Sequence, residues 1–424
     1  MQEVASQNAP SPSVVVPHFF AGGLSWLAVA GLVAAFPEAL VQHYFNPKLL
    51  AIVHLFVSGF ATMVIFGALY QLIPVILGVK LFSERLARAS FLLLAAGAVL
   101  LAAAFWNFSP GALLCVAATL VLLAVLLFSF NIFKTASHAG GKSIERDFIL
   151  TSVLWLVFTV VLGFVLALNL TQAFLPLSHL EWLKMHAHAG MVGWFLQLII
   201  GVGSRLMPMF LVAQRLNRKK LDAAWYLINA GLFAGLIGVF LQNRWIVVLN
   251  VAMAAAGAAC FLSFLIEAFR KRGKRQLDTG MKHSALSFGL LAVAATLLSV
   301  LLSKGRAPET FTLPLSVAYG SAWLGGFVTS LIMGQTYKTL PFIIWLKIYR
   351  KRVGKGKTPL PRDLYSGKMA VVQLWVYATG FFVLLAGVLL THPVVVSVGG
   401  LLLLLSAVLY NLNLWRIIFH KPVA

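Results

Sequence analysis

Twelve apolar stretches, each long enough to cross a lipid bilayer, make up most of the sequence and are joined by short polar loops. The hydrocarbon core offers no water to unpaired backbone groups, so only helices and closed barrels cross it, and about 20 apolar residues suffice for a helix. With 61% hydrophobic and 10% charged residues, the chain does not have the composition of a soluble domain. We therefore predict an all-α membrane protein with about twelve transmembrane helices. The predicted spans are 18–36, 49–79, 88–105, 111–133, 149–172, 182–213, 222–241, 245–269, 283–303, 313–346, 369–390 and 394–418.

Three of these stretches carry the same pattern. Counted from a starting residue, a glycine stands at the fifth following position, an aromatic residue at the sixth, a glycine at the thirteenth and a proline at the twentieth. The copies lie just over 130 residues, or about four helices, apart, which is typical of an internal repeat. The sequence thus predicts three four-helix arcs around a pseudo-threefold axis, with repeat helices at 49–79, 182–213 and 313–346. The three copies are His54, Gly59, Phe60, Gly67 and Pro74; His188, Gly193, Trp194, Gly201 and Pro208; and Ser321, Gly326, Phe327, Gly334 and Pro341.

The basic residues predict the orientation of the chain. Of the Lys and Arg residues, 26 lie in alternate loops and at the C-terminal end, and 5 lie in the loops on the opposite side. Because basic loops stay in the cytoplasm, we expect both termini to be cytoplasmic, in a bacterial-type inner membrane. The net charge of +22 then serves orientation and contact with lipid, and no nucleic-acid partner is expected. Residues 1–17 are expected to form a polar tail, and residues 18–424 a single polytopic domain.

Three histidines lie near the outer ends of two repeat helices: His54, His186 and His188. Ionisable side chains inside a membrane are costly and usually functional. His186 and His188 are two residues apart, so on a helix they point about 200° apart and cannot chelate one ion together. They can instead serve cofactors on two flanks of the helix, and the flat, apolar, histidine-ligated cofactor of suitable size is haem. We predict one or two haems, with His54 and one histidine of 182–213 sharing one of them. The alternative is that all three are neutral histidines that hydrogen-bond backbone carbonyls.

Other candidate site residues follow from position. Gly59 and Gly193 allow close approach of a haem or of a neighbouring helix. Arg244 and Arg306 lie in outer loops and could bind haem propionates, although ordinary loop roles fit equally well. We expect the remaining histidines to lie at helix ends, in loops or at the wrong depth for a ligand, and no carboxylate lies deep in a predicted helix. Those histidines are His18, His43, His138, His179, His283, His392 and His420.

At these residues the chain resembles subunit I of the haem–copper oxidase superfamily, which includes cytochrome oxidases and nitric oxide reductases. That family has twelve helices in three arcs, with histidines near the outer ends of helices 2, 6 and 10. The repeat motif is also similar to the NnrS family of haem- and copper-associated membrane proteins, where a histidine motif precedes Gly-Phe and a later proline. The likeness covers nearly the whole chain in architecture but only the repeat segments in motif.

The sequence departs from the oxidase pattern at the metal ligands. In the oxidases the H-x-H pair lies on helix 10, and helices 6 and 7 supply copper ligands. Here the pair is on helix 6, helix 10 has Tyr319 and Ser321 at the corresponding positions, and helix 7 has no histidine. The copper site therefore does not carry over, and copper is expected to be absent or substoichiometric. By the resemblance, His54 corresponds to the helix 2 ligand of the low-spin haem.

The resemblance implies a haem-binding redox protein of respiratory electron transport, an oxidoreductase that binds or reduces nitric oxide or oxygen. Its expected partners are the lipid bilayer, the small gas ligand and an electron-donor subunit such as a cytochrome. The alternative is a non-catalytic, NnrS-like haem or copper protein that acts as a gas sensor or as a respiratory assembly or stress factor. A solute transporter that merely shares the repeats is a third interpretation.

Overall fold

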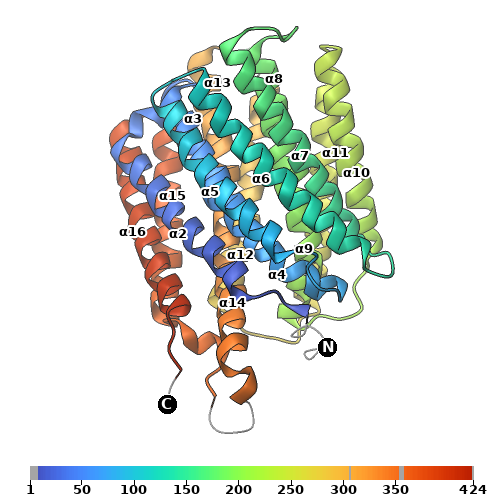
Figure 1. Ribbon diagram of the computed structural model, residues 1–424. Helices are drawn as coiled ribbons and strands as arrows, with labels where there is room; N and C mark the ends of the chain where they lie inside the picture. Colours follow the sequence, from blue (N-terminus) through green and yellow to red (C-terminus); the bar gives the residue numbers. More distant parts are fainter. Residues whose placement is uncertain (1–7, 305–306, 353–357, 423–424) are drawn as a thin grey trace. The chain divides into compact units, whose positions relative to one another are not determined.

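The computed structural model describes residues 8–304, 307–352 and 358–422, and within these ranges every regular element is helical (Figure 1). In this described part of the chain, twelve helical spans are long and apolar enough to cross a membrane, which confirms the predicted all-α, multi-pass membrane fold. The long elements are α2 (Pro12–Ala35), α3 (Pro47–His54), η2 (Leu55–Thr62), α4 (Met63–Leu77), α5 (Glu84–Trp106), α6 (Ala112–Ser137), α7 (Ile144–Thr171), α8 (His179–His188), η3 (Ala189–Leu196), α9 (Gln197–Leu211), α10 (Lys219–Phe240), α11 (Arg244–Arg270), α12 (Thr279–Ser303), α13 (Glu309–Ser321), η4 (Ala322–Val328), α14 (Thr329–Tyr349), α15 (Gly367–Leu389) and α16 (Pro393–Ile418). Short 3-10 turns lie at η1 (Pro37–Leu40), η5 (Arg350–Arg352) and η6 (Pro361–Leu364).

The first helix begins earlier than hydropathy predicted. Residues 12–17, assigned to a polar tail, form the first turns of α2, while residues 1–7 lie outside the described part of the chain. Pro12 stands at the first helical position and the Ser11 hydroxyl accepts from the Ser13 amide, so capping chemistry starts the helix where polarity suggested a tail. The Ser11 amide also donates to the Glu84 carboxylate at 2.8 Å, which fixes this end of α2 against α5.

Each repeat helix contains a π-helical segment at the same place. The residue that opens each copy of the pattern is the last α-helical residue before the segment: His54 before η2, His188 before η3 and Ser321 before η4. Single π-helical turns are rare and often lie at functional sites. The threefold repeat is thus a repeat of local backbone conformation as well as of sequence.

The second glycine of each copy packs against the helix that comes before the repeat helix in the chain. A Cβ atom placed on Gly67, Gly201 or Gly334 would come within 3 Å of a neighbouring side chain. Small residues at such positions allow helix backbones to approach closely, which is how membrane helices associate without a hydrophobic driving force. The side chains that these Cβ positions would meet are His18 on α2, Phe148 on α7 and His283 on α12, at 2.6, 2.8 and 2.6 Å.

The chain forms two compact units. One consists of Met1–Ser109 together with Leu277–Ala424, and the other of Pro110–Gln276. Two such units within one helical protein do not decide whether the chain folds as one domain. The prediction of a single domain over 18–424 therefore stays a prediction.

The first unit is closed by pairing of its first and last helices, α2 and α16. Asn411 Nδ2 donates to the Gly23 carbonyl at 2.9 Å, and Ser397 Oγ donates to the Ala34 carbonyl at 2.9 Å. The later residue of α16 thus pairs with the earlier residue of α2, so the two helices run antiparallel. The start of α2 and the end of α16 consequently lie at the same end of this unit (Figure 1).

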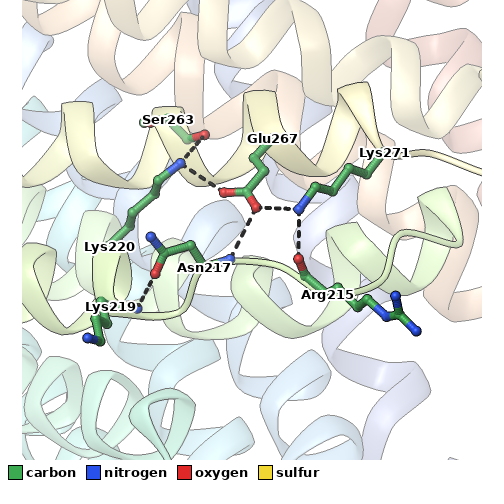
Figure 2. Close-up of polar contacts among 7 residues, drawn as sticks. All are labelled: Arg215, Asn217, Lys219, Lys220, Ser263, Glu267 and Lys271. Carbon is green, nitrogen blue, oxygen red and sulfur yellow. Dashed lines mark hydrogen bonds and ion pairs between the residues drawn. The ribbon is translucent and has the colours of Figure 1, made fainter.

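In the second unit, a carboxylate near the end of α11 fixes the segment between α9 and α10 (Figure 2). Glu267 accepts from Lys220 and Lys271, both at 2.9 Å, and from the Asn217 amide at 3.2 Å. Lys271 also donates to the Arg215 carbonyl at 2.8 Å. Two basic residues at helix ends, Lys220 and Lys271, are therefore used for structure in addition to any role in orientation.

Candidate functional site

His54 ends α3 directly before the π-helical segment η2. Its Nδ1 lies 2.8 Å from the Leu50 carbonyl oxygen, one helical turn back. Since a carbonyl oxygen only accepts, Nδ1 carries the proton and Nε2 keeps its lone pair. The half-buried ring stacks on Phe105 of α5 at a centroid distance of 4.5 Å and an interplanar angle of 28°. The Ser58 hydroxyl donates to the His54 carbonyl and so satisfies a backbone group at the change of helix type.

His188 occupies the same place in the second repeat helix and makes the same contact. It is the last residue of α8, and its Nδ1 lies 2.8 Å from the carbonyl of Lys184, four residues back. The ring is half-buried and has its proton on Nδ1, for the same reason as His54. His54 and His188 are therefore equivalent in sequence, in backbone position and in tautomer.

His186 points to a different neighbour. Its Nδ1 lies 2.9 Å from the Thr159 carbonyl on α7, and a Cβ atom placed on Gly163 would lie 2.8 Å from its Cε1. The ring is thus seated against α7, whereas the His188 ring is fixed by its own helix. Both rings hydrogen-bond a backbone carbonyl, as the non-cofactor interpretation also expects, and they contact different partners, as the predicted opposite directions require.

In the third repeat helix, hydroxyl groups satisfy the π-helical carbonyls. Tyr377 of α15 donates to the Gly325 carbonyl and, at 3.1 Å, to that of Gly326. Ser287 of α12 donates to the Phe327 carbonyl at 2.7 Å. Ser321 and Tyr319 stand at the positions that His188 and His186 occupy in the second repeat helix. The third repeat helix therefore has no histidine at these two positions, and its π-helical carbonyls are bonded by hydroxyls of α12 and α15.

The two glycines predicted to admit a haem or a helix face the preceding helix. A Cβ atom on Gly59 would lie 2.9 Å from the Ser25 hydroxyl on α2, and one on Gly193 would lie 2.7 Å from Trp155 on α7. The approach that these glycines allow is that of a neighbouring helix. Their proposed contact with haem stays untested.

Two arginines, Arg244 and Arg306, are predicted to bind haem propionates. Arg244 is exposed at the first position of α11. Arg306 lies outside the described residues, as does its neighbour at 305. Both remain predictions.

Two histidines that were assigned to helix ends are fully buried. His18 and His283 each have 0% exposure, and each faces the second glycine of a repeat helix, Gly67 and Gly334. The ring of His18 lies 5.6 Å from that of Tyr70, and the ring of His283 lies 6.4 Å from that of Tyr337. The signal was present in the sequence, because Tyr70 and Tyr337 occupy the same repeat position. The residues that cover His18 and His283 lie on other helices. Hydropathy does not determine how one helix is aligned along another.

Comparison with known proteins rests on structure alone. No protein-family model and no curated protein sequence matches the chain. Among solved structures, it is similar to a chain from a cryo-EM structure of a haem–copper terminal oxidase dimer, with a TM-score of 0.69. The alignment covers 98% of this chain and 86% of the oxidase chain, at 11% sequence identity. The chain has a haem–copper oxidase subunit I fold. At 11% identity this similarity shows the fold alone. The resemblance to the NnrS family stays a prediction.

The three repeat histidines fit the donor chemistry of haem. A histidine that binds iron needs its lone pair on one ring nitrogen, and the proton on the other is usually held by a carbonyl or carboxylate. His54, His186 and His188 all have Nδ1 bonded to a carbonyl, and their rings are half-buried. Within the described ranges, no three His, Cys, Asp or Glu residues gather as a metal cluster would require. The prediction on copper is not tested by that finding.

Proposed function

We propose that this chain is a haem-binding redox protein of the inner membrane, related to the haem–copper oxidases, whose haem iron is ligated by repeat histidines. The observation that supports this most is the equivalence of His54 and His188. These two histidines come from different repeat copies, and each ends an α-helix directly before a π-helical segment. Both rings also have the same tautomer. A structural hydrogen bond alone would not require histidine at both places, since the third copy has Ser321.

The side chains around each histidine determine its orientation. The carbonyls of Leu50 and Lys184 keep the proton on Nδ1, so Nε2 would be the nitrogen that binds iron, and these hydrogen bonds would raise its basicity. Phe105 stacks on His54 and limits rotation of its ring. The Thr159 carbonyl on α7 likewise keeps the proton of His186 on Nδ1. When bound, haem supplies one-electron redox chemistry and a coordination position for nitric oxide or oxygen.

Arg244 belongs to the same proposal as a cation for a haem propionate, together with Arg306. Gly59 and Gly193 act indirectly, by setting the distance between each repeat helix and its neighbour. The proposed partners are the bilayer, the gas ligand and an electron donor such as a cytochrome subunit.

A pyridine haemochrome assay combined with metal analysis of the purified protein tests the proposal. We expect one or two haems per chain and absent or substoichiometric copper, because only repeat histidines are proposed as ligands. Protein purified without haem, and unable to take it up, would support a transporter that shares only the repeats. One copper per chain retained after washing with chelator would contradict the expectation for copper.

One observation favours a non-catalytic role as a second candidate. The third repeat helix, where oxidases have their H-x-H pair by the resemblance, has Tyr319 and Ser321 and a π-helical segment closed by hydroxyls. A gas sensor or a respiratory assembly factor would bind haem and ligand without turnover. Consumption of nitric oxide or oxygen by the haem-loaded protein with an artificial electron donor separates the two functions.

We also expect both termini on the cytoplasmic side, because 26 Lys and Arg residues lie on one side and 5 on the other. A cytoplasmic reporter fused after Ala424 should be active, and a periplasmic reporter at the same position should be silent. The matched control is a fusion in the loop at 242–243, between α10 and α11, which should give the opposite pattern. A C-terminal fusion active only in the periplasm would overturn the orientation.

A further inference from the structure

His283 of α12 is buried with a hydrogen-bond partner near each ring nitrogen. Its Nε2 lies 2.9 Å from Gln373 Oε1 on α15, and its Nδ1 lies 3.3 Å from Ser330 Oγ on α14. All three residues have 0% exposure. A neutral imidazole has one donor and one acceptor nitrogen, and here each of them has a partner that is itself fully buried.

The surrounding hydrogen bonds fix which group donates. Gln373 Nε2 donates to Ser406 Oγ at 2.8 Å and to Met333 Sδ at 3.2 Å, so its Oε1 is the atom that faces His283. The Nε2–H of His283 therefore donates to Gln373. Nδ1 is left as the acceptor in the neutral ring and faces a hydroxyl.

Ser330 can serve both protonation states without movement of a heavy atom. Its hydroxyl lies 3.3 Å from His283 Nδ1 and 3.0 Å from the His283 carbonyl. With a neutral ring, the hydroxyl donates to Nδ1. With a second proton on Nδ1, the ring donates to Ser330 Oγ and the hydroxyl turns to the carbonyl. Every donor of the imidazolium then has an acceptor, which limits the penalty of burying the charge.

A row of tyrosine rings connects His283 to an ion pair at one end of the helices. The Tyr337 ring lies 6.4 Å from His283 and 5.0 Å from the stacked ring of Tyr365. Burial, and then the nearby Asp278 carboxylate, raises the pKa of Tyr365, a half-buried residue before α15. Asp278, which caps α12, pairs with Lys338 of α14.

The titratable groups that face His283 come from two helices. Tyr337 approaches from α14, and Tyr377 approaches from α15 with a ring distance of 6.1 Å. The segment η4, which also packs on α12, contains no titratable residue. The nearest charged groups on the row are the paired Asp278 and Lys338. The neighbours of His283 are therefore neutral hydroxyls and amides, so uptake of a proton there adds one net charge.

We propose that His283 is a buried proton-accepting site that takes one proton at Nδ1 from water at the Asp278–Lys338 end, past Tyr365 and Tyr337. The imidazole becomes an imidazolium, and the proton returns by the same route when it is released. This route requires water molecules between the polar atoms of these rings to carry the proton. This site lies on helices without the repeat histidines and does not depend on the proposed binding of haem.

The chain contains its own control in His18. It occupies the corresponding place against Gly67, and its Nδ1–H donates to the Val14 carbonyl at 2.8 Å. Its Nε2 is buried and has no hydrogen-bond partner among the described residues. A proton added at Nε2 would be an unsatisfied buried donor, which adds to the cost of burying the charge. His18 is therefore expected to stay neutral where His283 titrates.

Nitrogen-15 NMR of histidine-labelled protein in liposomes tests the proposal between pH 9 and pH 3.5, because burial among neutral groups opposes the charge. The His283 and His18 signals are assigned by their loss in His283→Asn and His18→Asn, with His283→Gln as a second variant if the first does not fold. We expect the His283 ring to change to the imidazolium form at a higher pH than the His18 ring, because only His283 has an acceptor for each N–H. A His283 ring that stays neutral throughout this range, or a His18 ring that titrates with it or before it, overturns the proposal.

Two further measurements test the partners and the route. Gln373→Met removes the acceptor of Nε2–H. Half protonation of His283 should then need a proton concentration at least about tenfold higher than in the parent. In sealed liposomes with one protein orientation, acid on the Asp278 side alone should protonate His283. An unchanged midpoint in Gln373→Met, or protonation only from the opposite side, contradicts the proposed site.

Discussion

Replacing His54 with alanine is expected to remove a low-spin haem signal from the optical spectrum while a second haem remains bound. The alanine side chain offers no nitrogen to iron, and the proposed ligand at this place in the first repeat helix is lost. His188→Ala and His186→Ala should each change the spectrum as well, and differently, because the two rings bond different partners. One of them should resemble His54→Ala, and the other should abolish binding of the gas ligand. Absorbance spectra of the reduced proteins, with and without nitric oxide, measure all three effects.

The matched control for these substitutions is His138→Ala. His138 has the same contact through Nδ1, 2.6 Å from the carbonyl four residues back, but it is exposed at the end of α6 and outside the repeat. Its loss should leave every spectrum unchanged. If the repeat histidines only bond carbonyls, their alanine variants would behave like His138→Ala and lose at most about 1–3 kcal/mol of stability. Spectra identical to the parent in all three variants would end the haem hypothesis, and equal loss of all haem in each would indicate a single site.

The helical spans could be predicted because one physical requirement determines them. A backbone in hydrocarbon must satisfy its own hydrogen bonds, so long apolar runs become helices of spanning length. The ends were harder to predict, since they depend on caps and loops in a polar environment. The structure begins α2 at Pro12 and extends the helix from Glu309 through Arg352, beyond the predicted 313–346.

The repeat could be predicted from sequence, but its π-helical segments could not. Hydropathy does not distinguish a helix of 3.6 residues per turn from a wider one. The wider turn is accommodated by hydroxyls on other helices, such as Ser287 and Tyr377 on the η4 carbonyls. Those contacts join residues about 40 to 50 positions apart, so no local pattern shows them.

The buried histidines were missed because depth was judged from the distance to a predicted helix end. His283 was placed at the start of its span, whereas α12 begins at Thr279 and has His283 in its second turn. The fold then seats the ring against Gly334 and Gln373 from two other helices. Burial here follows from the absence of a side chain at Gly334, and only the repeat pattern pointed to that glycine.

Replacing Gly193 with leucine is expected to abolish stable folding of the second unit. A Cβ atom at Gly193 would lie 2.7 Å from both Cβ and Cγ of Trp155, which is 6% exposed and donates to Asn229 at 3.1 Å. The indole cannot move without breaking that hydrogen bond and separating the η3 backbone from α7. Overpacking of a fitted core typically costs about 1–3 kcal/mol, and a full side chain at this distance should exceed that range. Yield of monodisperse protein and its thermal midpoint in detergent measure the effect.

Two variants separate helix packing from any direct contact of this glycine with haem. Gly320→Leu lies on a repeat helix where a Cβ atom would meet nothing within 4 Å, so it should fold like the parent. Adding Trp155→Ala to Gly193→Leu makes room for the leucine, and the double variant should be more stable than Gly193→Leu, which is the coupling expected of residues in contact. A Gly193→Leu protein that keeps the parental thermal midpoint but loses haem would instead indicate that the glycine faces the cofactor. Because α7 approaches this glycine so closely, we expect stability to fall first, and any loss of haem to follow from it.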